Sequence, residues 1–365
     1  MDELGGCFMY EQELTNIRLK IQEALKKLGS EPEAAIQDFM NIKAEAENTF
    51  PAESPEWYAT LASVEEHLGN IAARQKKNVD AEKHYKEMVR LSVKLFDKDN
   101  DKFDFRLGTA FHRLAKFYTT LIQCDRMQLK PVVLDGQKEK IFKTCEMIFN
   151  DAIRCTLKNG KSGKGMYVEF HSVCMHDMMV FYAAAGKYEE ALKHGKNGIQ
   201  LEKAIYEKMD DKVHSFRLAE RMTALAAVYT ASNDLQSAME TLEDAIFALE
   251  EHEADDPVKF GLMLGRSYIS LAGTYDRLPE EAAQAEDTFK KGYAKLEEVQ
   301  EKTKKIFLDD MISANVVLGE FYKKKERPEA KVYFQEALKL AQAFKEQTKN
   351  ARYDYLIAKL KVQVR

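Results

Sequence analysis

The sequence predicts an all-α fold, a right-handed α-solenoid of about seven helical hairpins that ends in a C-terminal capping helix. Two observations lead to this prediction. Apolar and small residues recur at spacings of three and four, which places them on one face of each helix. The small residue that opens the second helix of each hairpin recurs with a nearly constant period. Only seven prolines and 17 glycines in 365 residues also favour long helices.

The stretch Met222–Leu249 carries the pattern most clearly. Its first half places four residues on one helical face, at spacings of three, one and three: Met222, Leu225, Ala226 and Tyr229. Ser232, Asn233 and Asp234 follow as turn formers and offer an N-cap. The second half repeats small and apolar residues four and three positions apart: Ala238, Leu242 and Ala245. We therefore predict two closely packed helices joined by a tight turn.

The small residue at Ala238 has an equivalent along most of the chain. The equivalents are Ala35, Ala81, Cys145, Ala191, Ala238, Ala285 and Ala330. Their gaps are 46, 64, 46, 47, 47 and 45 residues, and five of the six agree within two residues. A period this steady indicates a repeat architecture, in which each unit buries its apolar face against its neighbours.

We expect a single superhelical domain over residues 1–365. The predicted pairs cover about 10–50, 54–98, 103–158, 166–209, 212–252, 257–303 and 307–346, and the capping helix covers 349–364. In the first pair, a helix from about Glu11 to Leu28 is ended by Gly29, and Pro32 suits the first turn of the next helix. Ser54 followed by Pro55 marks the start of the second pair.

The third pair contains an insertion at about Cys124–Gln137, which explains the gap of 64 residues. We interpret the insertion as a surface loop, with a flap over the binding groove as the alternative. The segment Asn159–Gly165 reads NGKSGKG but lacks the spacing and the preceding strand of a phosphate-binding loop. It is therefore predicted to be a flexible loop between helices.

The last four pairs keep the same plan with small changes in turn length. The turn of the fourth pair, Ala185–Ala191, is followed by small residues in its second helix. The turn of the sixth pair has one extra residue near Pro279, and that of the seventh has one fewer. The final helix alternates charged residues with Tyr355, Leu356 and Leu360, as expected of a cap with a polar outer face.

These hairpins resemble the tetratricopeptide repeat (TPR), a degenerate helix–turn–helix unit. The period of about 46 exceeds the usual value of about 34, so the chain is most similar to the long-helix repeats of kinesin light chains and Gram-positive peptide-pheromone receptors. The resemblance implies a non-enzymatic scaffold or protein-interaction module that binds an extended peptide or a helix in its concave groove. The alternative that it implies is a regulatory receptor for a short signalling peptide.

In this family the first helix of each pair lines the groove. Mapping the family's exposed positions onto this sequence gives the predicted peptide-binding residues: Asn70, Arg74, His112, Arg113, Lys116, His176, Thr223, Arg266 and Lys323. The surface is expected to be basic around the second and third pairs and apolar around the fourth and fifth. Asn70 matches one position of the family's clamp for chaperone tails, whereas Glu66 stands where that clamp has a lysine.

No nucleophile lies in a recognisable activating motif, so no enzyme and no cofactor are predicted. His171, Cys174 and His176 cannot converge on a metal ion, because His176 points away from the other two on a helix. A net charge of -5 gives no reason to expect nucleic-acid binding. Five cysteines without a C-x-x-C motif, no secretory signal and no apolar membrane span predict a cytoplasmic protein. The oligomeric state is not predicted.

Overall fold

A computed structural model describes residues 10–126, 138–161, 165–209, 211–303, 308–348 and 352–364. The described residues form fifteen α-helices and one short 3₁₀ helix, and no strand. The chain divides into two compact units, residues 1–185 and 186–365. Each unit is described by itself.

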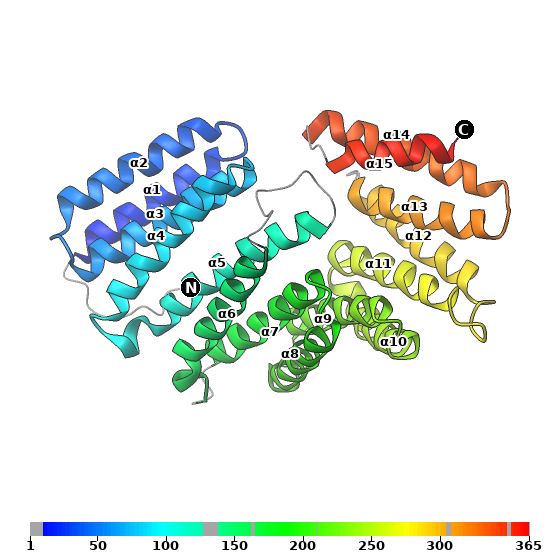
Figure 1. The fold of residues 1–365 in the computed structure, drawn as a ribbon, viewed down its shortest axis with the longest axis horizontal. Coiled ribbons are helices and arrows are strands. Elements are labelled where there is room, and N and C mark those ends of the chain that lie inside the picture. The colour runs from blue at the N-terminus through cyan, green and yellow to red at the C-terminus, as the bar shows by residue number, and fades with distance from the viewer. Residues whose placement is uncertain are drawn as a thin grey trace. The chain divides into compact units, whose positions relative to one another are not determined.

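The first unit consists of three helical hairpins and a seventh helix. Its helices are α1 (Glu11–Lys27), α2 (Pro32–Thr49), α3 (Pro55–Arg74), α4 (Asn78–Phe96), α5 (Asn100–Arg126), α6 (Lys138–Lys161) and α7 (Gly165–Ala184). Each helix packs against the next one in the chain, and α1 also contacts α3 as α5 contacts α7. The first helices of successive hairpins therefore lie next to one another, as can be followed in Figure 1.

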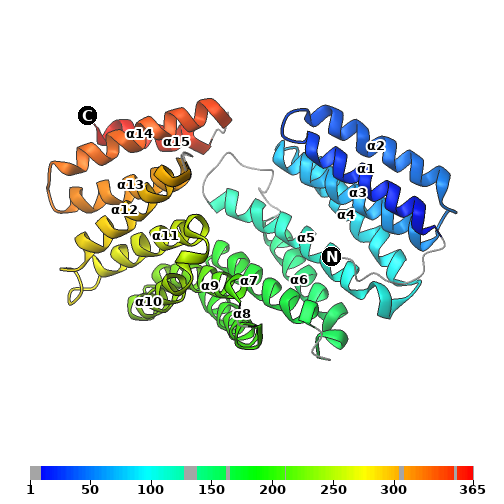
Figure 2. The same ribbon diagram turned by 180° about the vertical axis from the view of Figure 1, so that it is seen from behind.

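The second unit repeats this arrangement. Its helices are α8 (Tyr188–Met209), α9 (Lys212–Ala231), α10 (Leu235–Glu251), η1 (Glu253–Asp255), α11 (Pro257–Tyr275), α12 (Ala285–Thr303), α13 (Leu308–Lys324), α14 (Glu329–Thr348) and α15 (Arg352–Gln363). Successive helices pack in chain order, and α11 also contacts both α9 and α13 (Figure 2). The predicted all-α fold of consecutive hairpins is thus confirmed, while a single superhelical domain over residues 1–365 stays a prediction.

The small residues that define the repeat form the centre of the packing. Six of the seven are fully buried and the last, Ala330, is 9% exposed. One turn further along, a larger residue fills the space beside it in every second helix except α8, where Gly195 takes this position. The larger residues are Phe39, Tyr85, Phe149, Leu242, Phe289 and Phe334. The periodic pattern therefore marks the face that each second helix turns toward its neighbours.

Four of the turns inside the hairpins, those after α3, α7, α9 and α13, share one backbone geometry. After the first helix, one residue adopts a positive φ: 59° at Lys76, 66° at Asn233 and 54° at Glu326, with Gly186 at 78° after α7. In the three hairpins without glycine, the next residue's N–H donates to a carbonyl five residues earlier at 2.9 Å. This closure ends a helix tightly and satisfies its last carbonyl groups.

A tyrosine–glutamate hydrogen bond links neighbouring hairpins. A tyrosine of a first helix donates to a glutamate of the preceding second helix, at 2.6–3.2 Å. The pairs are Tyr118–Glu82, Tyr182–Glu146, Tyr275–Glu243 and Tyr322–Glu286. Burial and the nearby carboxylate raise the pKa of Tyr118 and Tyr275. In α9 the ammonium of Lys196 lies 5.6 Å from the ring centre of Tyr229 instead.

Two details differ from the expectations, and a third expectation falls on residues that are not described. Asn159–Lys161, expected in a loop, belongs to the end of α6. In α15 the buried residues are Tyr353, Ile357 and Leu360, whereas Tyr355 is 70% exposed. Residues 127–137 of the predicted insertion lie outside the described residues. None of the described helices is both long and apolar enough to span a membrane.

Two glycines test the close packing. A Cβ atom at Gly319 in α13 would lie 2.7 Å from the ring of Phe334 in α14, whereas one at Gly273 in α11 would meet nothing within 4 Å. Overpacking costs about 1–3 kcal/mol, and alanine gains about 1 kcal/mol over glycine in a helix. We expect Gly319→Ala to lower the thermal unfolding midpoint measured by circular dichroism. The matched Gly273→Ala variant should raise it, and an equal rise for both would contradict this packing.

Candidate functional site

The predicted peptide-binding residues of the first unit lie on α3, α5 and α7, the first helices of three successive pairs. We call the side of these helices that carries Asn70, Arg74, Arg113, Lys116 and His176 the first-helix surface. Arg113 Nε lies 3.1 Å from Glu66 Oε1 in α3, and Lys116 Nζ lies 3.2 Å from Asp177 Oδ2 in α7. Both cations stay about half exposed, at 47% and 49% of the side chain. They can therefore contact a ligand while keeping their partners.

His112 does not fit the exposed position that the mapping gives it. It is 5% exposed, and its Nε2 lies 2.6 Å from Asp177 Oδ2. Its ring packs edge-on against Phe149 and Phe170. The expectation of exposure is wrong because Asp177 on α7 draws the imidazole into the contact between α5 and α7.

Asp177 is the centre of this contact. Burial alone would raise its pKa, but the hydrogen bond from His112 and the positive charges of His112 and Lys116 lower it below the ordinary value. The carboxylate therefore stays charged while it is buried, and it ties two helices together through one hydrogen-bonded cluster.

The other predicted residues of this surface differ in exposure. Asn70 accepts a hydrogen bond of 2.7 Å from the hydroxyl of Tyr85 in α4, so its amide nitrogen remains able to donate. Arg74 is exposed at the last position of α3, and no ion pair joins it to a described residue. His176 is partly buried on α7, where its charge acts on Asp177.

In the second unit the predicted residues link successive first helices. Thr223 Oγ1 of α9 lies 3.0 Å from Ser267 Oγ of α11. Arg266 of α11 binds Asp310 of α13 with two hydrogen bonds of 2.6 and 2.9 Å, which raises the pKa of the arginine. Lys323 of α13 donates to Gln363 Oε1 in α15 at 2.7 Å. Each of these three residues is therefore already engaged in a contact between helices of this unit.

Most cross-links between first helices join residues about one repeat period apart. The pairs Thr223–Ser267, Arg266–Asp310 and Lys324–Asp276 span 44, 44 and 48 residues. The pair His112–Asp177 spans 65 residues, because the insertion lies between its members. Sequence reasoning missed both partners. For Asp310 the separation of about one period from Arg266 was a usable signal, whereas the insertion hides the same relation between His112 and Asp177.

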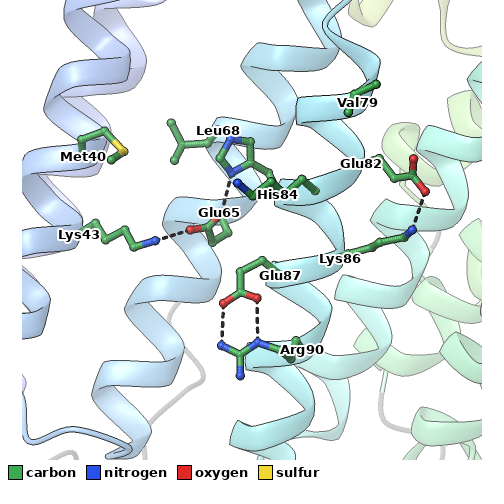
Figure 3. Close-up of a pocket in the computed structure, with 11 residues that line it drawn as sticks. Met40, Lys43, Glu65, Leu68, Val79, Glu82, His84, Lys86, Glu87 and Arg90 are labelled. Carbon is green, nitrogen blue, oxygen red and sulfur yellow. Dashed lines mark hydrogen bonds and ion pairs between the residues drawn. The ribbon is translucent and has the colours of Figure 1, made fainter.

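A second candidate surface lies between α2 and α4 over α3, as a hollow of about 780 Å³ (Figure 3). Glu65 at its floor is 3% exposed and is bound by Lys43 Nζ at 2.8 Å and His84 Nδ1 at 2.7 Å. Burial raises the pKa of Glu65, but the hydrogen bonds and charges of His84 and Lys43 lower it by more. The pKa of Glu65 therefore lies below its ordinary value. At the rim Glu87 binds Arg90 with two hydrogen bonds, so the charges here are mutually compensated.

The described residues offer little for covalent or metal chemistry. Burial raises the pKa of Cys145 and Cys155 to about 12, so that both thiols stay protonated at neutral pH. Burial also raises the pKa of Cys174. No group of three or more metal-ligating side chains occurs in the part of the chain that the structure describes. His171, one member of the spacing rejected above, lies 2.8 Å from Thr156 Oγ1.

The fold and these surfaces define a helical-repeat protein. No family model matches the sequence and no curated protein matches it. Solved structures do match. The apo form of RapI is 9% identical with a TM-score of 0.56, over 91% of this chain and 99% of RapI. Aspartyl phosphate phosphatase F from Bacillus subtilis is 15% identical with a TM-score of 0.50, over 94% of this chain and 78% of the phosphatase.

A third solved structure matches with a lower score. The TPR-like repeats of a kinesin light chain from Podosopora anserina are 15% identical with a TM-score of 0.46, over 67% of this chain and 98% of theirs. At such identities a likeness establishes the fold alone. The consecutive hairpins and the likeness to RapI together show a TPR-like fold, as the resemblance in the residues of this chain implies. One of these similar structures is named a phosphatase, so the fold by itself does not decide between catalysis and binding.

The Asp177 cluster predicts a pH dependence of stability. Because the pKa of Asp177 in the folded state lies below its ordinary value of 3.8, its contribution is complete above that value and is lost as the pH falls through the folded-state pKa. Asp177→Asn should lower the unfolding free energy at pH 7 by about 1.5–3 kcal/mol and weaken the loss on acidification. Urea titrations at pH 7 and pH 3, followed by the fluorescence of Trp57, would measure both effects.

Asp151→Asn is the matched control, because Asp151 forms an ion pair with Arg154, whose side chain is 80% exposed. That variant should change the unfolding free energy at pH 7 by less than about 1 kcal/mol. Equal effects of the two substitutions would mean that the cluster between α5 and α7 adds no more than an exposed ion pair.

Proposed function

We propose that this chain is a non-enzymatic protein-interaction module that binds an extended peptide or a helix of a partner protein across its first helices. The observation that carries the proposal is the charge of the first-helix surface in the first unit. Arg74, Arg113 and Lys116 are at least partly exposed on two neighbouring helices, α3 and α5. Asn70 lies among them with an amide nitrogen available to donate. This set favours an acidic peptide, whose carboxylates and backbone carbonyls accept hydrogen bonds.

The arrangement of the first helices supports this proposal. Arg113 and Lys116 of α5 are joined by ion pairs to Glu66 of α3 and Asp177 of α7, so these two cations are held in place between neighbouring helices. A rigid row of donors lowers the entropy lost on binding an extended chain. The TPR-like fold is of the protein-binding repeat kind, which agrees with a polypeptide ligand.

A binding assay with paired variants tests the proposal. A peptide array would first select acidic and basic 12-residue sequences, and fluorescence polarisation would then measure their affinity for the full chain. We expect acidic peptides to bind, with an affinity that falls as salt is added. Arg74→Glu should weaken binding by about fivefold to tenfold, since one charge-assisted contact is replaced by a repulsion.

Arg154→Glu supplies the control. It makes the same change of charge on α6, a second helix, at a residue that is 80% exposed. Its affinity for the peptide should equal that of the unmodified chain. Binding of no peptide at all, or equal losses in both variants, would reject the first-helix surface as the binding surface.

A further inference from the structure

A small hollow lies among the first helices α1, α3 and α5, apart from the predicted peptide-binding residues. It holds about 80 Å³. Ile17 of α1 and Phe103 of α5 contribute apolar walls, and both are buried. Arg18 of α1 and Arg106 of α5 contribute the charge. Two arginines therefore border a partly apolar hollow whose lining includes no carboxylate.

Arg106 is held in place without being neutralised. Its Nη2 donates to the main-chain oxygen of Ala59 in α3, which leaves further N–H groups of the guanidinium able to donate. Burial lowers its pKa to about 10, so that it still carries its charge at neutral pH. The carboxylate that acts on it, Glu66, is ion-paired with Arg113. Among the described residues no carboxylate binds either Arg106 or Arg18.

An anion stabilises a partly buried cation, because it replaces the water that the cation has lost. Thr60 and Ser63 also line the hollow, and the hydroxyl group of each can donate a hydrogen bond. The volume would hold roughly three water-sized groups at about 30 Å³ each. The carboxylate of a glutamate and the methylene group next to it match that size, so the second methylene of the side chain would lie at the mouth of the hollow. The inner methylene would contact Ile17 and Phe103.

We propose that this hollow binds the side chain of a glutamate carried by the peptide partner, with the carboxylate held between Arg18 and Arg106. The inference rests on the proposed function for its biological ligand, but the hollow itself can be tested with a small molecule. Arginine is the residue best suited to this role, because its planar donors bind both oxygens of a carboxylate. The site would fix the register of the bound peptide at one acidic position.

Butyrate is the probe, because it carries the carboxylate and the aliphatic stem of glutamate. The Nε–H resonances of the full ¹⁵N-arginine-labelled chain would be followed by NMR during titration, and variants would assign them. Butyrate should shift the signals of Arg18 and Arg106 saturably, whereas neutral butyramide should not. Arg18→Gln, at an exposed residue, should weaken butyrate binding by about tenfold, the loss expected for one charge-assisted hydrogen bond.

Arg154→Gln on α6 is the matched control and should leave the butyrate titration unchanged. Arg106→Lys keeps the charge but removes the planar pair of donors, so it should also weaken binding. Shifts of all exposed arginines by similar amounts, or no saturable shift of Arg106, would overturn the proposal. So would equal binding of butyramide.

Peptide binding separates this inference from the proposed function. If an acidic peptide binds the chain with the same affinity after Arg18→Gln, the first-helix surface stands and the glutamate site fails. If butyrate binds but no peptide does, the hollow is a carboxylate site and the proposed function fails.

Discussion

Each second helix buries its own apolar face against neighbouring helices, and the rest of the structure depends on this burial. The hairpins are too small to cover this face alone, so each must pack against the next one in the chain. Residues without bulk at the point of contact, such as Ala81 and Ala285, allow the helices to approach until larger residues fill the remaining space. The hydrophobic contribution of these contacts is not directional. Direction comes from the polar cross-links, above all the tyrosine–glutamate hydrogen bonds and the ion pairs between first helices.

Buried charges occupy several of these contacts. Glu65 is bound by Lys43 and His84, and Glu202 lies between His214 and Arg221 with 1% exposure. Such clusters add little net stability, because removing charges from water offsets most of their attraction. A shifted pairing of the helices would, however, leave a buried carboxylate without its partners. We interpret these clusters as devices that fix the alignment of neighbouring helices.

The fold could be predicted from the sequence because its repeat depends on the size and spacing of side chains within each helix. Ala238, Leu242 and Ala245 mark the packing face of one second helix, and the recurrence of this pattern along the chain identifies the hairpins. The candidate site was harder to predict, because its polar residues meet across helices. His112 occupies a position that is exposed in a generic repeat, yet Asp177 lies 65 residues further on and draws it inward. No property of either residue's own helix indicates that encounter.

The cross-links between first helices join residues about one period apart, as do Thr223 with Ser267 and Arg266 with Asp310. A first helix such as α11 therefore carries polar partners for both the preceding and the following hairpin. A gene duplication that copied one whole hairpin would insert a unit already equipped for both neighbours. The length of such a protein can thus change in steps of about 46 residues during evolution, while an insertion of any other length is tolerated only where it leaves the helices, as at the third pair.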